Sequence, residues 1–443
     1  MKIIPFCGYR YNSSKIQSLD DVISPPYDQY TEGLDDRLYI RHPYNISRII
    51  MNKETSSDSE QDNRYTRSRA LLDQWIRDRI FLQDPVPGFY SYFQNYLVEG
   101  VENCRKGFVA LGEVTDYSER IVLPHERTLV KPKQDRLNLL RATLADTGLV
   151  FMLYSDPAGE IENLLDQATS SAPLMSALDL NEEINQLWQM TDSALTNKIR
   201  EIMSNKSVII ADGHHRYEVA QMFKEEIKPR ITQDPRWEKY RYKIMSFVRL
   251  ESAGITIFPI HRLVRSLKGF SAADLIERLK DSFVVEEYPF GPENQMSTLD
   301  FLMTLSRKQQ HAGANAFVVY LPSLRRYVLL KLKEGSLERV QWPTDKSETW
   351  RKLDVSILQL IILGGLLGIT DQQLTDQSHL EYASQHEEAV RVVDQKGYQC
   401  AFLLNPTPVE MVRAVVEAGD VLPQKSTHFH PKLMEGLVFA KHL

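Results

Sequence analysis

The segment SVIIADGHHRYEVAQMF, residues 207–223, constrains the fold of this chain more than any other. It opens with an apolar run that is typical of a buried strand, and apolar residues then recur at helical spacing. Between the two, Asp212 suits a helix N-cap, and Gly213 permits positive φ or a close backbone approach. We expect the helix to end near Lys228, because Pro229 lacks a donor and disfavours helix in the residue before it. The segment therefore predicts a strand, a tight turn and a helix.

Three side chains that can carry positive charge, His214, His215 and Arg216, open this helix. A helix N-terminus is itself partly positive, so each cation there costs about 0.3–1 kcal/mol. A bound phosphate would remove the conflict, since exposed N–H groups and the dipole both favour an anion. Helical spacing puts Asp212, His215 and Arg216 on one face, with His214 pointing elsewhere. We interpret Gly213 and the three cations as a phosphate site; the alternative is a capped helix with a solvated first turn.

A second group of charged side chains lies in PHERTLVKPKQDR, residues 124–136. It combines an imidazole, two acids and four permanent cations: His125, Glu126, Asp135, Arg127, Lys131, Lys133 and Arg136. Such a mixture can clamp a phosphate and supply an acid or base, and it can equally be a solvated charged loop. We single out Glu126 as a general base or metal ligand. We expect Arg127, Lys131 and Lys133 to stabilise a transferring phosphoryl group.

Two short turns, PPYD at 25–28 and HPYN at 42–45, couple a rigid proline to a tyrosine and an acid or amide. Structural turns and pocket walls are both compatible with this chemistry. In the second interpretation Tyr27, Asp28 and Asn45 would line a substrate pocket together with His125.

The composition is that of a globular protein, with 42% hydrophobic and 25% charged residues among 443. This length exceeds one typical core, so we expect two domains, 1–267 and 268–443. The helix and strand patterns follow one another without a regular βαβ rhythm, which predicts an α+β, or mixed α/β, fold.

Charge and motif content exclude several functions. The net charge of −6 argues against a general nucleic-acid binder, and three scattered cysteines give neither a disulfide framework nor a zinc ribbon. The first residues are too polar for a signal peptide, and the longest apolar stretch, 355–369, is too short to span a membrane. We therefore expect a cytoplasmic protein without a membrane partner, haem, flavin or zinc; a homo-oligomer is compatible with the sequence. The usual P-loop, GxGxxG, HExxH and GxSxG signatures are absent.

A series of short motifs occurs here in the order of one known family: SPPYD, HPYN, LPHERT, KPKQDRLNLLRAT, LYSDP, ADGHHRYE, LDVSIL, AFLLNPTPVE, LPQKST and HPKL. On these motifs the chain resembles the family called domain of unknown function 1015 over nearly its full length, which implies a shared fold. Two segments depart from the family pattern. LADTGLVF, residues 144–151, lacks the Arg, Asn and Ser-Pro that are more common there, and Gln359 stands where His is common.

ADGHHR is also similar to a signature of the ParB/sulfiredoxin superfamily, in which a motif at a helix start holds nucleotide phosphates. That group includes CTP-hydrolysing partition proteins, ATP-using sulfiredoxin and ADP-dependent free serine kinases. The matching positions here are Asp212, Gly213, His214, His215 and Arg216. The resemblance implies a ParB/sulfiredoxin-like N-terminal domain that binds a nucleotide.

Three functions are compatible with these observations. The first is a phosphotransferase or phosphohydrolase that uses Mg²⁺ with ATP, ADP or CTP and acts on a small metabolite such as serine or phosphoserine. Its catalytic residues would be Glu126, Asp212 and His215, with Mg²⁺ at Glu126 or Asp212. The second is a ParB-like nucleotide-binding switch without metabolic turnover. The third is a metal-dependent hydrolase built on His125, His214 and His215.

Overall fold

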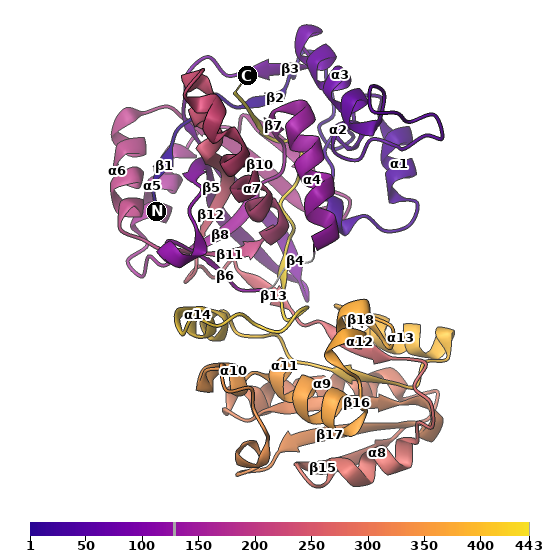
Figure 1. Ribbon diagram of the computed structural model, residues 1–443. Coiled ribbons are helices and arrows are strands. Elements are labelled where there is room, and N and C mark those ends of the chain that lie inside the picture. The colour runs from indigo at the N-terminus through magenta and orange to yellow at the C-terminus, as the bar shows by residue number, and fades with distance from the viewer. Residues whose placement is uncertain (127–129, 443) are drawn as a thin grey trace. The chain divides into compact units, whose positions relative to one another are not determined.

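The computed structural model describes residues 1–126 and 130–442, which form two compact units (Figure 1). The first unit comprises Met1–Pro124, Thr128–Thr256 and Pro431–Leu443, and the second comprises His125–Arg127 and Ile257–His430. The last segment of the chain thus belongs to the first unit. The domain boundary at 267/268 stays a prediction.

The first unit is built on a nine-stranded mixed sheet, in the order β6-β11-β8-β12-β5-β4-β10-β9, with β1 paired to β5. The pairs β11–β6 and β12–β8 are parallel, whereas the other pairs are antiparallel. The strands are β1 (Ile3–Ile4), β4 (Phe89–Val98), β5 (Val101–Glu113), β6 (Val122–Pro124), β8 (Val150–Tyr154), β9 (Met175–Leu178), β10 (Ile184–Met190), β11 (Val208–Asp212) and β12 (Tyr242–Arg249). β4 and β5 form a hairpin, with Gly100 in its turn at φ 79°.

Seven α-helices of the described residues belong to the first unit: α1 (Leu34–Arg41), α2 (Ser47–Ile50), α3 (Arg64–Arg77), α4 (Val130–Thr143), α5 (Glu160–Ala168), α6 (Ser193–Ser204) and α7 (His214–Ile231). Two small ribbons complete it, β2 (Tyr9–Tyr11) with β3 (Phe81–Gln83) and β7 (Ala145–Asp146) with β21 (Ala440–Lys441). Helices α4 and α7 lie side by side (Figure 1), joined by Leu137, Val219, Phe223 and Ile227.

The expected end of α7 near Lys228 is wrong, because the helix contains Pro229 and continues to Ile231. Ile227 belongs to the apolar cluster between α4 and α7, and Ile231 packs against that cluster. Packing of these two residues offsets the backbone hydrogen bond that proline cannot donate. Tertiary contact, rather than local propensity, sets this boundary.

The second unit holds a six-stranded antiparallel sheet in the order β15-β17-β16-β19-β14-β18. Its strands are β14 (His261–Val264), β15 (Phe283–Pro289), β16 (Ala316–Leu321), β17 (Arg326–Leu332), β18 (Leu380–Ala383) and β19 (Cys400–Leu403), and β13 (Thr256–Phe258) pairs with β20 (His428–His430). Its α-helices are α8 (Ala272–Leu279), α9 (Gln295–His311), α10 (Glu348–Arg351), α11 (Asp354–Ile357), α12 (Asp371–Asp376), α13 (His386–Lys396) and α14 (Val409–Glu417). A nine-residue π-helix, Leu358–Leu366, follows α11 directly.

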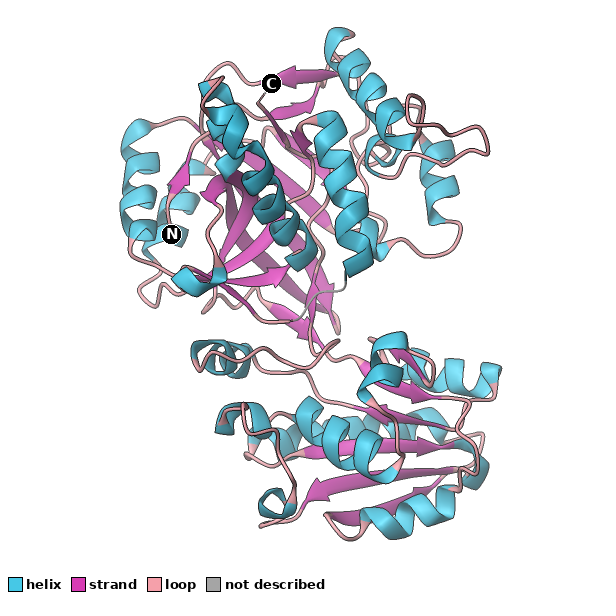
Figure 2. Ribbon diagram, viewed as in Figure 1, coloured by secondary structure: helices cyan, strands magenta, loops and turns pink. Residues whose placement is uncertain are grey.

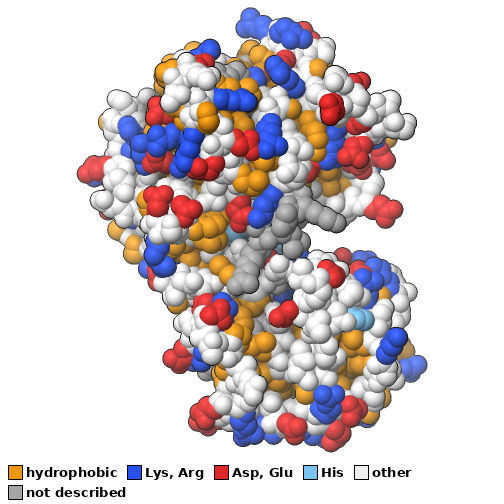
Figure 3. Space-filling model, viewed as in Figure 1, with side chains coloured by type: hydrophobic (Ala, Val, Ile, Leu, Met, Phe, Trp, Pro, Cys, Tyr) orange, Lys and Arg blue, Asp and Glu red, His pale blue; other side chains and the backbone are white. Residues whose placement is uncertain are grey.

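The predicted α+β class is confirmed, with helices and strands mixed in both units (Figure 2). On the face drawn in Figure 3, basic and acidic side chains are interspersed over each unit. Within the described residues, no helix has the length and apolar character needed to cross a membrane.

Candidate functional site

The turn between β11 and α7 has the predicted strand–glycine–helix form. Gly213 is the N-cap of α7 and adopts the left-handed conformation, with φ 88° and ψ 28°. Among the described residues, no side chain caps this helix. The predicted N-cap role of Asp212 is therefore wrong: Asp212 ends β11, and its Oδ2 lies 3.4 Å from Lys432 Nζ. The backbone N–H groups in the first turn of α7 can therefore donate hydrogen bonds to a ligand.

Arg216 folds back beneath this turn, with 6% of its surface exposed. Its Nη1 donates to the carbonyl oxygen of Leu149 at 2.5 Å. Two glycines make room for the guanidinium, since a Cβ at Gly148 would lie 3.0 Å from Arg216 Cδ and one at Gly213 would lie 3.2 Å from Nε. The glycine turn therefore packs closely against the buried Arg216 side chain.

Acidic groups from three parts of the chain surround Arg216. Its Nη2 lies 3.8 Å from Oδ2 of both Asp28 and Asp212. Burial lowers the pKa of Arg216, but Asp28, Asp212 and Glu435 together raise it above its ordinary value. The protein thus supplies counter-charges of its own to the cation at the positive end of α7.

One hydrogen-bond donor of Arg216 is unsatisfied by the described residues. Nε of Arg216 is buried and has no hydrogen-bond partner among the described residues. A buried donor without an acceptor costs about 1–3 kcal/mol. An acceptor oxygen from a ligand or a water molecule would remove that cost. Other arginines of the described residues, Arg249 among them, also have an unpartnered Nε, so this feature is compatible with a bound group and does not identify one by itself.

Asp212 is ionised in this setting. Burial raises the pKa of its carboxyl group, but Lys432, Arg216 and His214 outweigh burial and hold the pKa well below its usual range. Asp212 therefore offers a negative oxygen beside the N-terminus of α7, as a metal ligand or hydrogen-bond acceptor.

A cavity of about 50 Å³ adjoins Arg216. Its polar lining consists of Tyr27, Arg136, Asp146, Thr147, Arg216, Lys243 and Glu435. Small-molecule pockets measure roughly 300–1,000 Å³, so this space can hold a single functional group or a few water molecules rather than a whole nucleotide.

Lys243 and Asp146 form a buried ion pair in the wall of this cavity. The other carboxylate oxygen of Asp146 accepts a hydrogen bond from the Ile244 N–H at 2.9 Å. Burial lowers the pKa of Lys243 to about 7. A lysine that exchanges its proton near neutral pH can serve as an acid or base.

Tyr27 and Glu435 complete the wall. Arg136 lies over the Tyr27 ring, with Cζ 4.4 Å from the centroid, and burial raises the pKa of Tyr27 to about 12. Burial also raises the pKa of Glu435, against the effects of Arg216 and Arg136. These groups are arranged for hydrogen bonding in a low-dielectric space.

Five predicted site residues, Tyr27, Asp28, Asp212, Gly213 and Arg216, lie close together at the start of α7, and their role in binding stays a prediction. His214 and His215 form the first turn of α7, the former buried and the latter half-buried. Two predicted residues have structural partners instead. Lys133 pairs with Glu218 between α4 and α7. Asn45 is buried and donates to the carbonyl oxygens of Asp21, at 2.8 Å, and Ile23, at 3.1 Å.

His125 and Glu126 belong to the second compact unit. His125 Nε2 is 2.8 Å from Thr427 Oγ1, and Glu126 Oε1 accepts from the Lys425 N–H at 2.9 Å. Arg127 and the side chain of Lys131 lie outside the described residues. The predicted participation of these four residues in a phosphate site stays a prediction.

The sequence prediction missed four groups of the site: Asp146, Lys243, Lys432 and Glu435. A signal was available for two of them, because Lys432 stands in the HPKL motif and Glu435 follows it closely. Asp146 and Gly148 lie in LADTGLVF, the segment that departs from the family pattern, yet both line the cavity.

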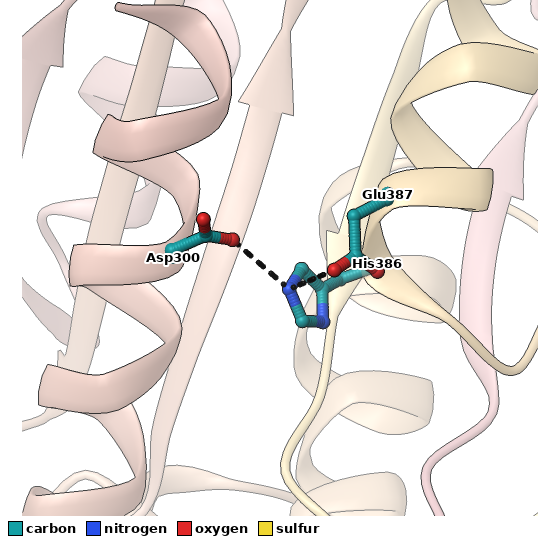
Figure 4. Close-up of side chains that lie close together, drawn as sticks. All are labelled: Asp300, His386 and Glu387. Atoms are coloured by element: carbon teal, nitrogen blue, oxygen red, sulfur yellow. Dashed lines mark hydrogen bonds and ion pairs between the residues drawn. The ribbon is translucent and has the colours of Figure 1, made fainter. Parts of the chain in front are cut away.

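A separate group of metal-type ligands lies in the second unit (Figure 4). His386 Nε2 is 3.4 Å from Asp300 Oδ1 and 3.2 Å from Glu387 Oε1, and both acids are exposed. This is the only trio of possible metal ligands found in the described part of the chain, and it includes none of the residues predicted to bind metal. Exposed acidic groups of this kind are common on protein surfaces without a metal, so the cluster does not by itself indicate one.

Fold and site together define an α+β protein whose first unit closes a strand–glycine–helix turn over a buried arginine. The chain belongs to the family described as "Protein of unknown function (DUF1015)", whose model matches residues 3–356. No curated protein matches the chain.

Three solved structures show a distant likeness. A conserved hypothetical protein from Pyrococcus furiosus is 12% identical, with a TM-score of 0.34, covering 72% of this chain and 90% of that one. A free serine kinase in complex with AMP is 14% identical, with a TM-score of 0.34, covering 72% and 86%. SbnI from Staphylococcus aureus, truncated at its C-terminus, is 10% identical, with a TM-score of 0.34, covering 74% and 85%. Likenesses this distant do not indicate a function for the chain.

Proposed function

We propose that the first unit binds the phosphate groups of a nucleotide at the N-terminus of α7 and catalyses transfer or hydrolysis of a phosphoryl group. The observation that carries this proposal is the uncapped start of α7 above a buried arginine whose Nε lacks an acceptor. Backbone N–H groups, the helix dipole and a guanidinium all favour phosphate oxygens. The cavity of about 50 Å³ would take one acceptor group, with the rest of the nucleotide outside it.

Each residue has a role in this proposal. The Gly213 backbone, His214, His215 and Arg216 bind phosphate oxygens, and Lys432 adds a positive charge beside Asp212. Asp28 and Asp212 converge on one nitrogen of Arg216, which fits the one or two carboxylates that commonly hold Mg²⁺ in phosphate sites. Such an ion would neutralise phosphate charge, and phosphoryl transfer depends mainly on positioning and charge neutralisation. Lys243, with its pKa of about 7, would serve as the base, whereas Asp212, whose pKa lies well below its usual range, would act as a Mg²⁺ ligand or hydrogen-bond acceptor.

Our proposal for the acceptor rests on the motif alone. ADGHHR resembles the corresponding segment of ADP-dependent free serine kinases, so we propose a small hydroxylated metabolite such as serine, or its phosphate ester. Arg127, Lys131 and Glu126 remain proposed contributors to charge stabilisation and proton transfer.

Thermal unfolding with ATP, ADP or CTP, with and without Mg²⁺, tests the binding step. A ligand at about 100 times its Kd stabilises the folded state by about 2.7 kcal/mol, which raises Tm by about 5–11 °C for a unit of this size. We expect this shift for wild type and for Arg249→Gln, a control arginine paired with Glu162 in the same unit. We expect no shift for Arg216→Gln.

Failure of every nucleotide to stabilise wild type would contradict the proposal. Turnover is tested separately, by release of phosphate or nucleoside diphosphate in the presence of serine. Nucleotide binding that changes the oligomeric state without turnover would instead favour a switch protein.

A further inference from the structure

The second unit contains a cavity of about 370 Å³, within the usual range for small ligands, roughly 300–1,000 Å³. All its lining residues belong to that unit. They include Leu422, Pro423 and Gln424, which open the LPQKST motif, and Gln359, which departs from the family pattern. The proposed phosphate site uses none of these residues.

Arg262, on β14, supplies the buried charge of this cavity, with 5% of its surface exposed. Its Nη1 donates to the Ile260 carbonyl oxygen, and Nη2 donates weakly to that of Gln424, at 3.4 Å. The guanidinium lies 5.6 Å from the centroid of the Tyr382 ring, and burial lowers its pKa to about 10 although Tyr382 and Glu126 act to raise it. Within the described part of the chain, Arg262 makes no ion pair with a carboxylate. Arg262 is hydrogen-bonded, among the described residues, only to carbonyl oxygens and Glu126 acts on it without direct contact, so it lacks the paired carboxylate that normally accompanies a buried cation.

The other cation of the cavity, Lys346, is already compensated. Its Nζ lies 3.1 Å from Asp420 Oδ1 and 3.2 Å from Asp345 Oδ2, and 5.8 Å from the centroid of the Trp350 ring. The lining acids Asp345 and Asp371 are exposed. Of the two cations that line the cavity, Arg262 is therefore the one without a carboxylate ion-pair partner among the residues that the structure describes.

A second, independent feature points to the same cavity. The π-helix Leu358–Leu366 presents Gln359, Leu360 and Leu363 to it. π-Helices are rare, usually span a single turn and occur frequently at functional sites, whereas this one has nine residues. Its wide winding puts an amide and two leucine side chains on one wall.

We propose that this cavity binds a small carboxylate with an aromatic or branched apolar body. The carboxylate would accept hydrogen bonds from Arg262, since a monoanion matches one guanidinium and a carboxylate matches its planar fork. The apolar body would lie against Leu360, Leu363 and Leu380, with the Trp350 and Tyr382 rings beside it. Gln359 supplies an amide that can orient the ligand. This site does not depend on the proposed function of the first unit.

Isothermal titration of the full chain with phenylacetate and 4-methylpentanoate tests the proposal, with phenylacetamide and 4-methylpentanamide as neutral isosteres. We expect the acids to bind wild type and the amides to bind at least about tenfold more weakly, because a charge-assisted hydrogen bond is lost. Arg262→Gln should weaken acid binding by a similar factor. Arg265→Gln is the matched control, one residue beyond the same strand and bonded to the Gln377 carbonyl oxygen outside the cavity.

A second variant, which keeps Arg262, tests the proposal even if Arg262→Gln fails to fold. Leu363→Trp fills the cavity while leaving the charge in place, and we expect it to abolish acid binding. Equal binding of acids and amides, absence of binding by all four compounds, or tighter binding of phenyl phosphate than of phenylacetate would each overturn the proposal. Nucleotide-induced stabilisation in the same preparations would be unaffected in every case.

Discussion

Lys243 and Asp146 are the most deeply buried ion pair of the candidate site, with side-chain exposures of 8% and 12%. Lys243→Met would leave the Asp146 carboxylate buried without a cation, and breaking such a pair costs about 3–5 kcal/mol. We expect a loss of that size in urea-induced unfolding at pH 6, where Lys243 is protonated; at pH 7 its pKa of about 7 leaves the pair only partly charged. Asp146→Leu in the same background should recover part of it, because the orphaned charge is then removed.

The same lysine predicts a pH dependence. Its pKa in the folded protein is about 7, below the value of about 10.4 expected in the unfolded chain. Between these values the unfolded state binds more protons, so the stability of wild type relative to Lys243→Met should rise as pH increases from 7 towards 10. Urea titrations at pH 6, 7.5 and 9 measure this difference. A constant difference would mean that contact with Asp146 keeps Lys243 charged throughout.

Asp212 predicts the opposite trend, on the acid side. Lys432, Arg216 and His214 hold its pKa below the value of about 3.9 in the unfolded chain, despite burial. The stability that this carboxylate contributes is therefore present above about pH 4 and is lost as pH falls below it. Asp212→Asn should cost about 1–3 kcal/mol at pH 6 and progressively less towards pH 3, as measured by urea unfolding. A cost that is independent of pH would contradict this assignment.

The sequence alone could not identify the groups that interact with Asp212 and Arg216. The cations at the start of α7 and their conflict with the helix dipole are visible locally. Asp28 and Glu435, which compensate Arg216, lie far from it along the chain and meet it only through folding. The conflict singled out this turn as a candidate phosphate site, which stays a prediction, whereas the acidic groups that surround Arg216 could be identified only from the structure.

At the scale of elements, the strand, turn and helix of 207–223 could be predicted because periodicity and glycine conformation are local properties. The cap was misassigned because Asp212 and Gly213 both suit an N-cap and differ by one position. The π-helix at 358–366 was not predicted, since a continuous apolar run carries no period that distinguishes helix types.

Gly213 offers a test of the turn itself. Gly213→Ala places a Cβ at φ 88° and 3.2 Å from Arg216 Nε, so we expect a loss of stability of about 1–2 kcal/mol or more, together with weakened nucleotide binding. Gly33→Ala is the matched control: Gly33 is also a left-handed N-cap, at φ 75°, with nothing within 4 Å of the added Cβ. The control should lose stability and retain binding, as measured by thermal unfolding with and without ligand. If the two variants bind nucleotide equally well, Gly213 is not part of the nucleotide site.

At the scale of the whole molecule, the chain leaves its first unit after Thr256 and returns to it at Pro431. A division of this kind is not visible in composition, because the returning segment is short and joins existing structure instead of forming its own. Arg105 Nη2 binds the Pro431 carbonyl oxygen at 2.5 Å, and Phe439 exchanges backbone hydrogen bonds with Tyr9. β21 pairs with β7, next to the Lys243–Asp146 pair.

Because residues 431–443 belong to the first unit, we expect their removal to destabilise that unit more than the second. The truncation deletes Lys432 and Glu435 from the site, removes the buried Phe439 from the core of the first unit and leaves the buried guanidinium of Arg105 without one acceptor. Burial of a phenylalanine alone contributes about 1.5–3 kcal/mol, so we expect a large fall in the unfolding temperature of the first unit and loss of its nucleotide response. The second unit keeps its own sheet and cavity, and its acid binding should persist. Calorimetry of the truncated chain, compared with Phe439→Ala in the full chain, measures both effects. A single transition that shifts as a whole would show instead that the two units unfold as one cooperative body.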